Sequence, residues 1–374
     1  MAELPVRFAP RSALQTDLRT AVDSWFTTHG TARTAPAHQK RKVAILLGSW
    51  VTLLATFGLW GPGYLGAMLL ALPLGLVLGG IGFSVMHDAN HGAFSRNPKV
   101  NAALGFTLDL LGASSFVWRI KHNQVHHAFT NMEGLDDDLE MGKLGRLSPS
   151  QPHYAFHRFQ HIYLWPLYGF ISIKWHWFDD FLQMRAGHIG PRAIPRLTRG
   201  QWAQFVTGKV MFFSWALVMP IAVAGVGPGL TLYFVSQTFL GVILAVVFQL
   251  AHCVEPAGFM PVADRGAPVD FVRHQLMTTI DFAPGNRLVT WYVGGLNYQA
   301  VHHLFPQVSH GWYPQIAPVI ARVAAEHGAA YQSIPTLRAA IASHYRFIKR
   351  MGRPVTEVAS GTWADDGSAP AGTV

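Results

Sequence analysis

Two long stretches without a charged side chain dominate the hydrophobic pattern of this chain. They cover residues 43–86 and 210–254, and each is long enough for two membrane-spanning helices of about 20 residues. Glycine and proline interrupt each stretch, at Gly61–Gly63 and at Gly225–Gly229, and such clusters are turn signals. The pattern therefore predicts two helical hairpins, the first made of Val43–Trp60 and Tyr64–Met86 and the second of Val210–Ala224 and Leu230–Ala251.

Basic residues before each stretch indicate its orientation in the membrane. Lys40, Arg41 and Lys42 precede the first hairpin, and residues 185–199 hold four arginines before the second. Since cytoplasmic loops collect Lys and Arg, both hairpins are expected to begin and end on the cytoplasmic side. We therefore predict an all-α, multi-pass integral membrane protein with four transmembrane helices, a cytoplasmic helical cap and both termini in the cytoplasm.

This interpretation divides the chain into six parts. They are a cytoplasmic N-terminal segment (1–42), the first hairpin (43–86), a first cytoplasmic or interfacial part of the cap (87–209), the second hairpin (210–252), a second part of the cap (253–355) and a disordered tail (356–374).

Four shorter segments carry weaker patterns. Ser12–Phe26 has apolar side chains on one helical face, which predicts an amphipathic helix on the bilayer or on the cap. Asn101–Ile120 is apolar but contains a carboxylate and small polar residues, which favours a re-entrant or interfacial helix. His161–Trp177 is aromatic, short and interrupted by Pro166, so we expect it at the interface as well. Tyr313–Glu326 predicts a helix of the cap.

The composition agrees with this fold class. Half of the 374 residues are hydrophobic and only 13% are charged, which is too apolar for an ordinary soluble domain. Cys253 is the only cysteine, which excludes an intramolecular disulfide and a cysteine-based zinc or iron–sulfur site. Basic cytoplasmic flanks explain the net charge of +9 better than nucleic-acid binding does, and this charge also suits an acidic electron donor. The N-terminus has no short apolar segment with a cleavage site, so we expect no signal peptide.

Histidines gather where the helices are expected to reach the cytoplasm. Three motifs, HDANH at 87–91, HNQVHH at 122–127 and QAVHH at 299–303, have spacings that bring side chains to one helical face. His252 ends the last apolar run, where an ionisable residue is functional by default. The candidate metal ligands are His87, His91, His122, His126, His127, His252, His302 and His303, with Gln299 as a ligand, as the holder of a metal-bound water or as a packing residue.

The number of these side chains favours two metal ions over one. A tetrahedral zinc site needs four ligands, and the eight histidines exceed that. Adjacent histidines point in diverging directions, which also suits two ions. Imidazole-rich sites bind iron, zinc, copper or nickel. We expect the remaining histidines to be core or surface residues.

Polar residues near the motifs are candidates to support the ligands, because metal-bound histidines usually donate their second N–H to a carboxylate or carbonyl. The sequence offers Asp88, Asp109, Asn131, Asp136, Asp137, Asp138, Gln249 and Asn297, of which we choose Asp88, Asn131, Asp137, Gln249 and Asn297. A solvated loop is the alternative for the acidic run at 136–138.

The three motifs resemble the histidine boxes of the membrane fatty acid desaturase family, and the resemblance extends from about Lys40 to Ile320. The third motif begins with glutamine where many members of the family have histidine, and this variant resembles the front-end, linoleoyl-CoA-desaturase-like branch. This resemblance implies four transmembrane helices under a cytoplasmic cap. It also implies two iron ions held by the eight histidines, with Gln299 in the extra place, and O₂ as co-substrate.

One feature of that branch is missing. The sequence has no His-Pro-Gly-Gly motif of a fused cytochrome domain. The resemblance then implies a separate electron donor, such as a ferredoxin or a free cytochrome with its reductase, and a bacterial enzyme of the inner membrane.

The resulting hypothesis is a desaturase that introduces a cis double bond into an acyl chain carried by CoA, a carrier protein or a phospholipid. Trp118, Trp177, Trp291 and Tyr298 lie near the motifs and are candidates to line an apolar acyl tunnel. A lipid or isoprenoid hydroxylase or ketolase is the alternative, because both outcomes start from the same oxidant. A metal transporter is disfavoured, since its ligands would lie near the middle of the bilayer.

Overall fold

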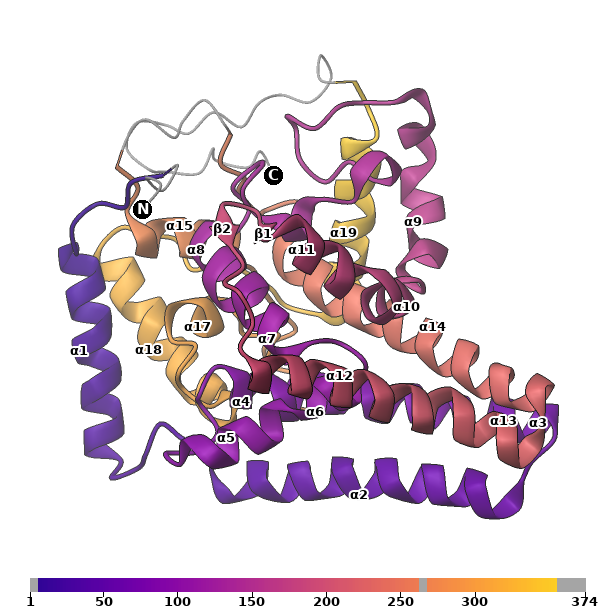
Figure 1. Cartoon of the computed structure of the whole chain (residues 1–374). Coiled ribbons are helices and arrows are strands. Elements are labelled where there is room, and N and C mark those ends of the chain that lie inside the picture. The colour runs from indigo at the N-terminus through magenta and orange to yellow at the C-terminus, as the bar shows by residue number, and fades with distance from the viewer. Residues whose placement is uncertain (1–5, 262–267, 355–374) are drawn as a thin grey trace.

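The computed structural model describes residues 6–261 and 268–354, and it is built mainly of helices (Figure 1). The predicted disordered tail from Thr356 lies outside the described residues. The described residues also hold short strands, which the predicted all-α class lacks. β1 (His188–Ile189) pairs antiparallel with β2 (Arg192–Ala193), and β3 (Asp281–Phe282) pairs parallel with β4 (Ser333–Ile334).

Four helical stretches in the described residues are long and apolar enough to cross a membrane, as predicted. The first is α2 (Ala37–Trp60). The second is α3 (Tyr64–Ile81), which continues through the π-helix η1 (Gly82–Met86) into α4 (His87–Asn90). The third joins α12 (Arg199–Phe213), the π-helix η7 (Ser214–Val218) and α13 (Met219–Ala224), and the fourth is α14 (Val226–His252). The chain is therefore an integral membrane protein.

The first of these helices begins earlier than predicted, at Ala37 instead of Val43. Lys42 belongs to this extra length, and its side chain is buried, with Nζ 5.2 Å from the centre of the Trp291 ring. Lys42 is thus part of the packed interior and not of a solvated basic flank.

The third stretch also begins earlier, at Arg199 instead of Val210. Thr198 and Gln201 form a capping box, in which each side chain accepts a hydrogen bond from the backbone N–H of the other. Such a box satisfies backbone donors that the first turn of a helix leaves free. A search for apolar runs misses this start because the first turn is polar.

The second predicted turn is shorter than its sequence indicated. Gly225 alone breaks the chain, with φ of 85°, and α14 begins at Val226 instead of Leu230. Pro228 lies in the first turn of α14, where its missing N–H leaves no helical hydrogen bond unmade.

The membrane helices pack through apolar side chains and close backbone approaches. α2, α3 and α14 share one buried cluster that includes Phe57, Leu74, Leu78 and Leu240. Figure 1 shows these long helices running alongside one another, with the shorter elements gathered at one end. That end carries all the candidate ligands.

The segment after α4 bends sharply. α5 (Pro98–Gly105) and α6 (Thr107–Leu110) are followed by α7 (Ser115–Trp118), the π-helix η2 (Arg119–His126) and α8 (His127–Phe129). The two halves meet at an angle of 110°, which fits a broken span or the re-entrant segment predicted for Asn101–Ile120.

A second irregular segment leads back to the membrane. It consists of α9 (Gln160–Tyr168), α10 (Ile171–Lys174), the π-helix η6 (Trp175–Asp179) and α11 (Asp180–Ala186). The predicted interruption at Pro166 is wrong, because Pro166 lies inside α9 and the helix ends two residues later at Tyr168.

The remaining elements form the gathered end of the molecule. They are α1 (Ala13–Thr28), α15 (Phe271–Thr278), α16 (Arg287–Tyr292), α17 (Gln299–Leu304), α18 (Tyr313–Glu326) and α19 (Leu337–Met351), with the short 3₁₀ turns η3 (Asp137–Leu139), η4 (Gly142–Leu144), η5 (Ala155–Phe159) and η9 (His310–Trp312).

The helices predicted at Ser12–Phe26 and Tyr313–Glu326 are confirmed. α1 buries the apolar face expected for Ser12–Phe26, and Ser12 caps its first turn. α18 begins and ends at the predicted residues. The apolar faces of α1 and α18 share one core cluster, so the amphipathic helix packs on the cap.

Candidate metal centre

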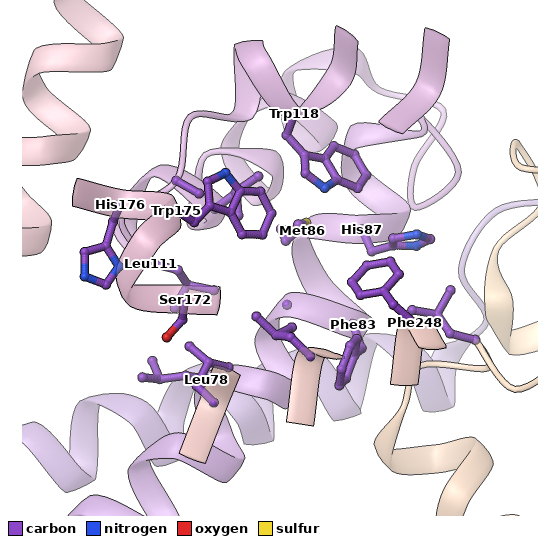
Figure 2. A pocket seen from close by; sticks show the side chains of 16 residues that line it. Leu78, Phe83, Met86, His87, Leu111, Trp118, Ser172, Trp175, His176 and Phe248 are labelled. Carbon is purple, nitrogen blue, oxygen red and sulfur yellow. The ribbon is translucent and has the colours of Figure 1, made fainter. Parts of the chain in front are cut away.

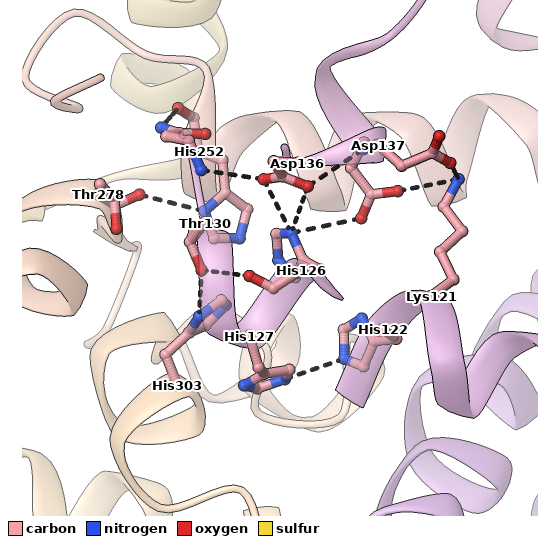
Figure 3. Close-up of polar contacts among 12 residues, drawn as sticks. Lys121, His122, His126, His127, Thr130, Asp136, Asp137, His252, Thr278 and His303 are labelled. Atoms are coloured by element: carbon pink, nitrogen blue, oxygen red, sulfur yellow. Dashed lines mark hydrogen bonds and ion pairs between the residues drawn. The ribbon is translucent and has the colours of Figure 1, made fainter. Parts of the chain in front are cut away.

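The eight candidate histidines converge on one place, although they come from four parts of the chain. Figure 3 shows His122, His126, His127, His252 and His303 with their polar contacts. The first motif lies on and just after α4, the second on η2 and α8, and the third on α17, while the last residue of α14 is His252. Seven of the eight side chains are buried and His91 is half-buried.

The ring nitrogens of these side chains form two neighbouring sets. One, called here the first group, consists of His87, His91, His122 and His302. The other, the second group, consists of His126, His252 and His303. Within each group the potential ligand atoms lie within 4.8 Å of one another. His127 connects the groups, because it lies at the same close range to both His302 and His303.

A π-helix explains how the second motif reaches both groups. In η2 the backbone hydrogen bonds are wider than in an α-helix, so residues four and five apart both lie near one another. His122 consequently contacts His126 and His127, with ring centres 5.4 and 4.7 Å apart. His126 and His127 therefore diverge as predicted. His126 belongs to the second group, whereas His127 lies between the two groups.

The pattern of hydrogen bonds fits a metal-binding donor set. Nδ1 of His126 donates to Asp136 at 3.2 Å, and Nδ1 of His303 donates to Oε1 of Gln275 at 2.9 Å. In both rings Nε2 is buried and has no hydrogen-bond partner. A buried polar atom without a partner is costly, whereas a ring held through Nδ1 offers Nε2 to a metal ion.

The surroundings also favour the neutral form of His302 and His303 in the third motif. Burial lowers the pKa of His302 and His303 well below its ordinary value, and neighbouring histidines lower it further. Neutral imidazole is the form that binds metal ions. The arrangement therefore suits cations held by nitrogen.

The third motif is placed by its flanking loop. Gly294 and Gly295 have φ of 62° and 68°, and a Cβ at Gly294 would lie 2.3 Å from the backbone oxygen of Phe83. Glycine is thus required for the loop to lie against η1. Asp281 then accepts the N–H of Ala300 in the first turn of α17 at 3.2 Å, and burial raises the pKa of this carboxyl to about 7.

The acidic run supports the site, but through a different carboxylate from the predicted one. Asp136 contacts His126 and also accepts the backbone N–H of Asn131 at 2.9 Å. Asp137 instead forms an ion pair with Lys121 at 2.9 Å. The reason is the turn η3, which Asp136 caps and which directs the next carboxylate away. Asp138 lies 3.4 Å from Nδ1 of His126 and is a second acidic neighbour.

Two other predicted supports act on the backbone or on a neighbouring loop. Asn131, at φ of 53°, donates to the backbone oxygen of His252 at 2.9 Å, whereas the ring of His252 donates to the oxygen of Thr278 at 3.1 Å. Asp88 accepts hydrogen bonds from Ser309 and from the ring of His310. It therefore ties the first motif to η9.

The last two predicted supports do not contact the rings. Asn297 donates to the backbone oxygen of Ala283 and to the hydroxyl of Thr290, which stabilises the loop before α17. Oε1 of Gln249 has no hydrogen-bond partner within the described residues.

Gln299 presents an oxygen to the interior. Its Nε2 donates to the backbone oxygen of Leu296 at 2.7 Å, and its Oε1 is buried without a hydrogen-bond partner. The side chain lies against His252 of the second group. A carbonyl oxygen in this position could complete the second group.

Gln275 and Tyr313 are among the supporting residues that sequence reasoning missed. Gln275 on α15 binds His303 through Oε1 and the backbone oxygen of His127 through Nε2. The hydroxyl of Tyr313 lies 3.2 Å from Nδ1 of His302. Neither residue belongs to a histidine motif, so only the folded chain reveals them.

A cavity adjoins the first group (Figure 2). It lies between α3, α14 and the segments around α6, α7 and α10, and its free space, including parts open to the surroundings, amounts to about 560 Å³. His87 and Trp118 border one end, and Ser172 and His176 border the other. Most of the lining is aliphatic or aromatic, so the cavity suits an apolar chain next to the histidines.

Of the four aromatic residues expected to line a tunnel, only Trp118 borders this cavity. Trp177 and Trp291 are 43% and 45% exposed, and the hydroxyl of Tyr298 donates to the backbone oxygen of Pro284. Nearness in sequence to a motif therefore did not identify the lining, which comes from α3 with η1, from α14 and from the segments around α6, α7 and α10.

Sequence comparison relates the chain to proteins of lipid metabolism. The sequence model of a family described as fatty acid desaturase matches residues 63–335. The chain is 36% identical over 354 residues to a protein of Synechocystis named sn-1 linoleoyl-lipid 6-desaturase, covering 93% of this chain and 98% of that one. It is 38% identical over 313 residues to a protein of the same name from Arthrospira platensis, covering 83% and 84%. It is 34% identical over 336 residues to an acyl-lipid (8-3)-desaturase of Physcomitrium patens, covering 88% and 70%.

Proposed function

The chain belongs to the fatty acid desaturase family, and from this premise we propose that it is an O₂-dependent desaturase that introduces a cis double bond into an acyl chain. The observation that carries the proposal is the apolar cavity bordered by His87, because it places an apolar lining beside a set of nitrogens that could bind metal.

Two iron ions are the proposed cofactor. The first group, with four imidazoles, would hold one ion. The second group, with three imidazoles and the oxygen of Gln299, would hold the other, and His127 lies between them. When bound, the irons would supply reduction of one O₂ to two waters, using two hydrogens of the acyl chain together with two electrons and two protons from the donor side.

The residues of the chain orient the reactants and exclude water. Trp118 stacks on His122, with ring centres 4.4 Å apart, and borders the cavity beside His87. Asp136, Gln275 and the oxygen of Thr278 orient rings of the second group. Rings held in this way keep Nε2 directed inward without rearrangement during turnover.

An acyl group of a membrane lipid is the proposed substrate. The relatives from Synechocystis and Arthrospira are named for a linoleoyl lipid, and the moss relative for an acyl lipid. The cavity lies between helices that cross the membrane, so an acyl tail could reach it from the bilayer.

A separate electron donor and a cytoplasmic site complete the proposal. We place the gathered end of the molecule, with the metal centre and both termini, on the cytoplasmic face of a bacterial inner membrane. Lys40 and Arg41 at the start of α2, and Arg185, Arg192 and Arg196 before α12, support this orientation. A ferredoxin, or a free cytochrome with its reductase, would donate electrons, and an acidic donor would match the net charge of +9.

The test is expression in a host that lacks its own desaturases, followed by mass spectrometry with double-bond mapping. We expect acyl chains two hydrogens lighter than their precursors, and about two irons in the purified protein. His126→Ala is expected to abolish the product. His161→Ala is the matched control, because His161 belongs to neither group, and it is expected to retain activity.

A product that gains an oxygen and keeps its hydrogens would replace the desaturase by a hydroxylase. Supplying the purified protein with acyl-CoA, acyl carrier protein or glycerolipid, each with the same acyl chain, identifies the carrier. Conversion of acyl-CoA alone would contradict a lipid-bound substrate.

A further inference from the structure

One glycine in the wall of the cavity has no structural reason to be glycine. Gly82 is the first residue of η1 and borders the cavity. Its φ and ψ are both −53°, which any residue adopts, so backbone conformation does not require glycine. Glycine inside a helix also destabilises it relative to alanine.

Packing does not require glycine at this position either. On the same helix, a Cβ at Gly75 would lie 2.8 Å from the backbone oxygen of Ser236 on α14, and a Cβ at Gly79 would lie 2.9 Å from the hydroxyl of Tyr292. Those glycines permit the close approach of helices. A Cβ at Gly82 would meet nothing nearer than a methyl carbon of Leu244, at 3.9 Å, which is an ordinary contact.

The free space at Gly82 lies within the cavity and one helical turn from the metal centre. In a π-helix the hydrogen bonds join residues five apart, so Gly82 and His87 lie on the same side of the helix. Across the cavity, α14 contributes Leu240, Leu244 and Phe248 at intervals of four residues. A Cβ at Gly82 would contact Leu244, the middle one, so a side chain there would occupy cavity space between η1 and α14.

We propose that Gly82 is a specificity-determining residue, and that its missing side chain is the opening through which the acyl chain passes from His87 to the far part of the cavity. That part is bordered by Leu78, Ser172 and His176, which lie away from His87 in Figure 2. The inference rests on the proposed desaturase function. It adds that acyl chains reaching beyond Gly82 need this opening and that shorter ones do not.

Gly82→Ala and Gly82→Val test the proposal in the full-length protein. Each is supplied with myristoyl, palmitoyl, stearoyl and linoleoyl lipids. The ratio of long-chain to short-chain product is expected to fall by about tenfold in Gly82→Ala and further in Gly82→Val, since one methyl group in an apolar pocket discriminates at that level. The unfolding temperature of Gly82→Ala is expected to match or exceed that of the wild type, because the methyl group fits and helical glycine is replaced.

Gly58→Ala is the matched control. Gly58 also lies inside a membrane helix and has room for a Cβ, with Sδ of Met219 at 3.8 Å, but it does not border the cavity. Its chain-length profile is expected to equal that of the wild type. An unchanged profile in both Gly82 variants would overturn the proposal, and so would an equal loss for all chain lengths.

A binding measurement separates this inference from the proposed function. A stearoyl lipid with a photoreactive group at its methyl end is expected to label the peptide that contains Ser172 in the wild type but not in Gly82→Val. If this labelling is seen and no double bond forms, the desaturase proposal fails while the opening at Gly82 stands. If double bonds form and both proteins are labelled alike, the opening at Gly82 is refuted.

Discussion

The two histidine groups have different surroundings. The first group borders the cavity at His87, and its rings are surrounded largely by aromatic and other imidazole rings, such as Trp118 stacked on His122. In the second group, every ring has an oxygen partner from the protein, supplied by Asp136, Thr278 and Gln275.

This difference indicates that the two groups have different roles in the site. The first group borders the cavity proposed to hold the acyl chain, and its position follows from how helices pack around that cavity. The second group is held by polar contacts with Asp136, Thr278 and Gln275, none of which lines the cavity. We therefore expect changes in hydrogen bonding to affect mainly the second group, and changes in cavity shape to affect mainly reaction at the first.

Removal of a ring from either group is expected to cause the largest effect. His91→Ala in the first group and His303→Ala in the second each remove one proposed ligand. Activity should fall by more than about 100-fold in both, because loss of a ligand exceeds the 10–100-fold effect of losing an outer partner. Metal analysis of the purified variants, beside a chelator-treated wild type, checks this. Full metal content with full activity in either variant would remove that residue from the site.

Asp136→Asn is expected to have the next largest effect. The carboxylate accepts from His126 and from the backbone of Asn131, so its charge both orients and polarises the ring. Iron retention or activity should fall by about 10–100-fold. Asp137→Asn is the matched control, because that carboxylate pairs with Lys121, and it should change activity less than about twofold. Equal effects of the two variants would mean that the acidic run acts only through its total charge.

The contrast between Asp136 and Asp137 also shows which features could be predicted from the sequence. Ligand candidates were recognisable because their spacing follows helical periodicity, which is a local property. The choice between Asp136 and Asp137 depended on a 3₁₀ turn three residues long, which no hydrophobic pattern reveals. Similarly, the apolar centres of the membrane helices were predictable, whereas the start at Arg199 depended on a polar capping box.

Contacts between distant segments were the least predictable part. Gln275 reaches His303 from a different helix, and His310 meets Asp88 although more than 200 residues separate them. The π-helix before the first motif and the π-helix that carries most of the second are also tertiary features, since an isolated sequence with these spacings is expected to form an α-helix. The candidate ligands could therefore be listed from the sequence, whereas most of their hydrogen-bond partners and the cavity depend on the folded chain.

Tyr313→Phe tests whether hydrogen bonds to the rings matter less in the first group than in the second. The hydroxyl of Tyr313 is 3.2 Å from Nδ1 of His302, and both partners are uncharged. A neutral hydrogen bond contributes about 1 kcal/mol, so we expect roughly a fivefold loss of iron retention or activity. The measurement is iron content during titration with a chelator. A loss as large as that of Asp136→Asn would show that both groups depend equally on their outer partners.

Gln299→Leu is expected to have the smallest effect of the series. The substitution keeps the volume of the side chain and removes the buried oxygen that lies beside the second group. Because an amide oxygen is a weak ligand beside three imidazoles, iron retention should fall by only about threefold. Chelator titration of this variant beside His303→Ala measures the difference. If Gln299→Leu loses iron as completely as His303→Ala, Gln299 is a full ligand. The second group would then have four protein ligands, like the first, and the two groups would differ only in their surroundings.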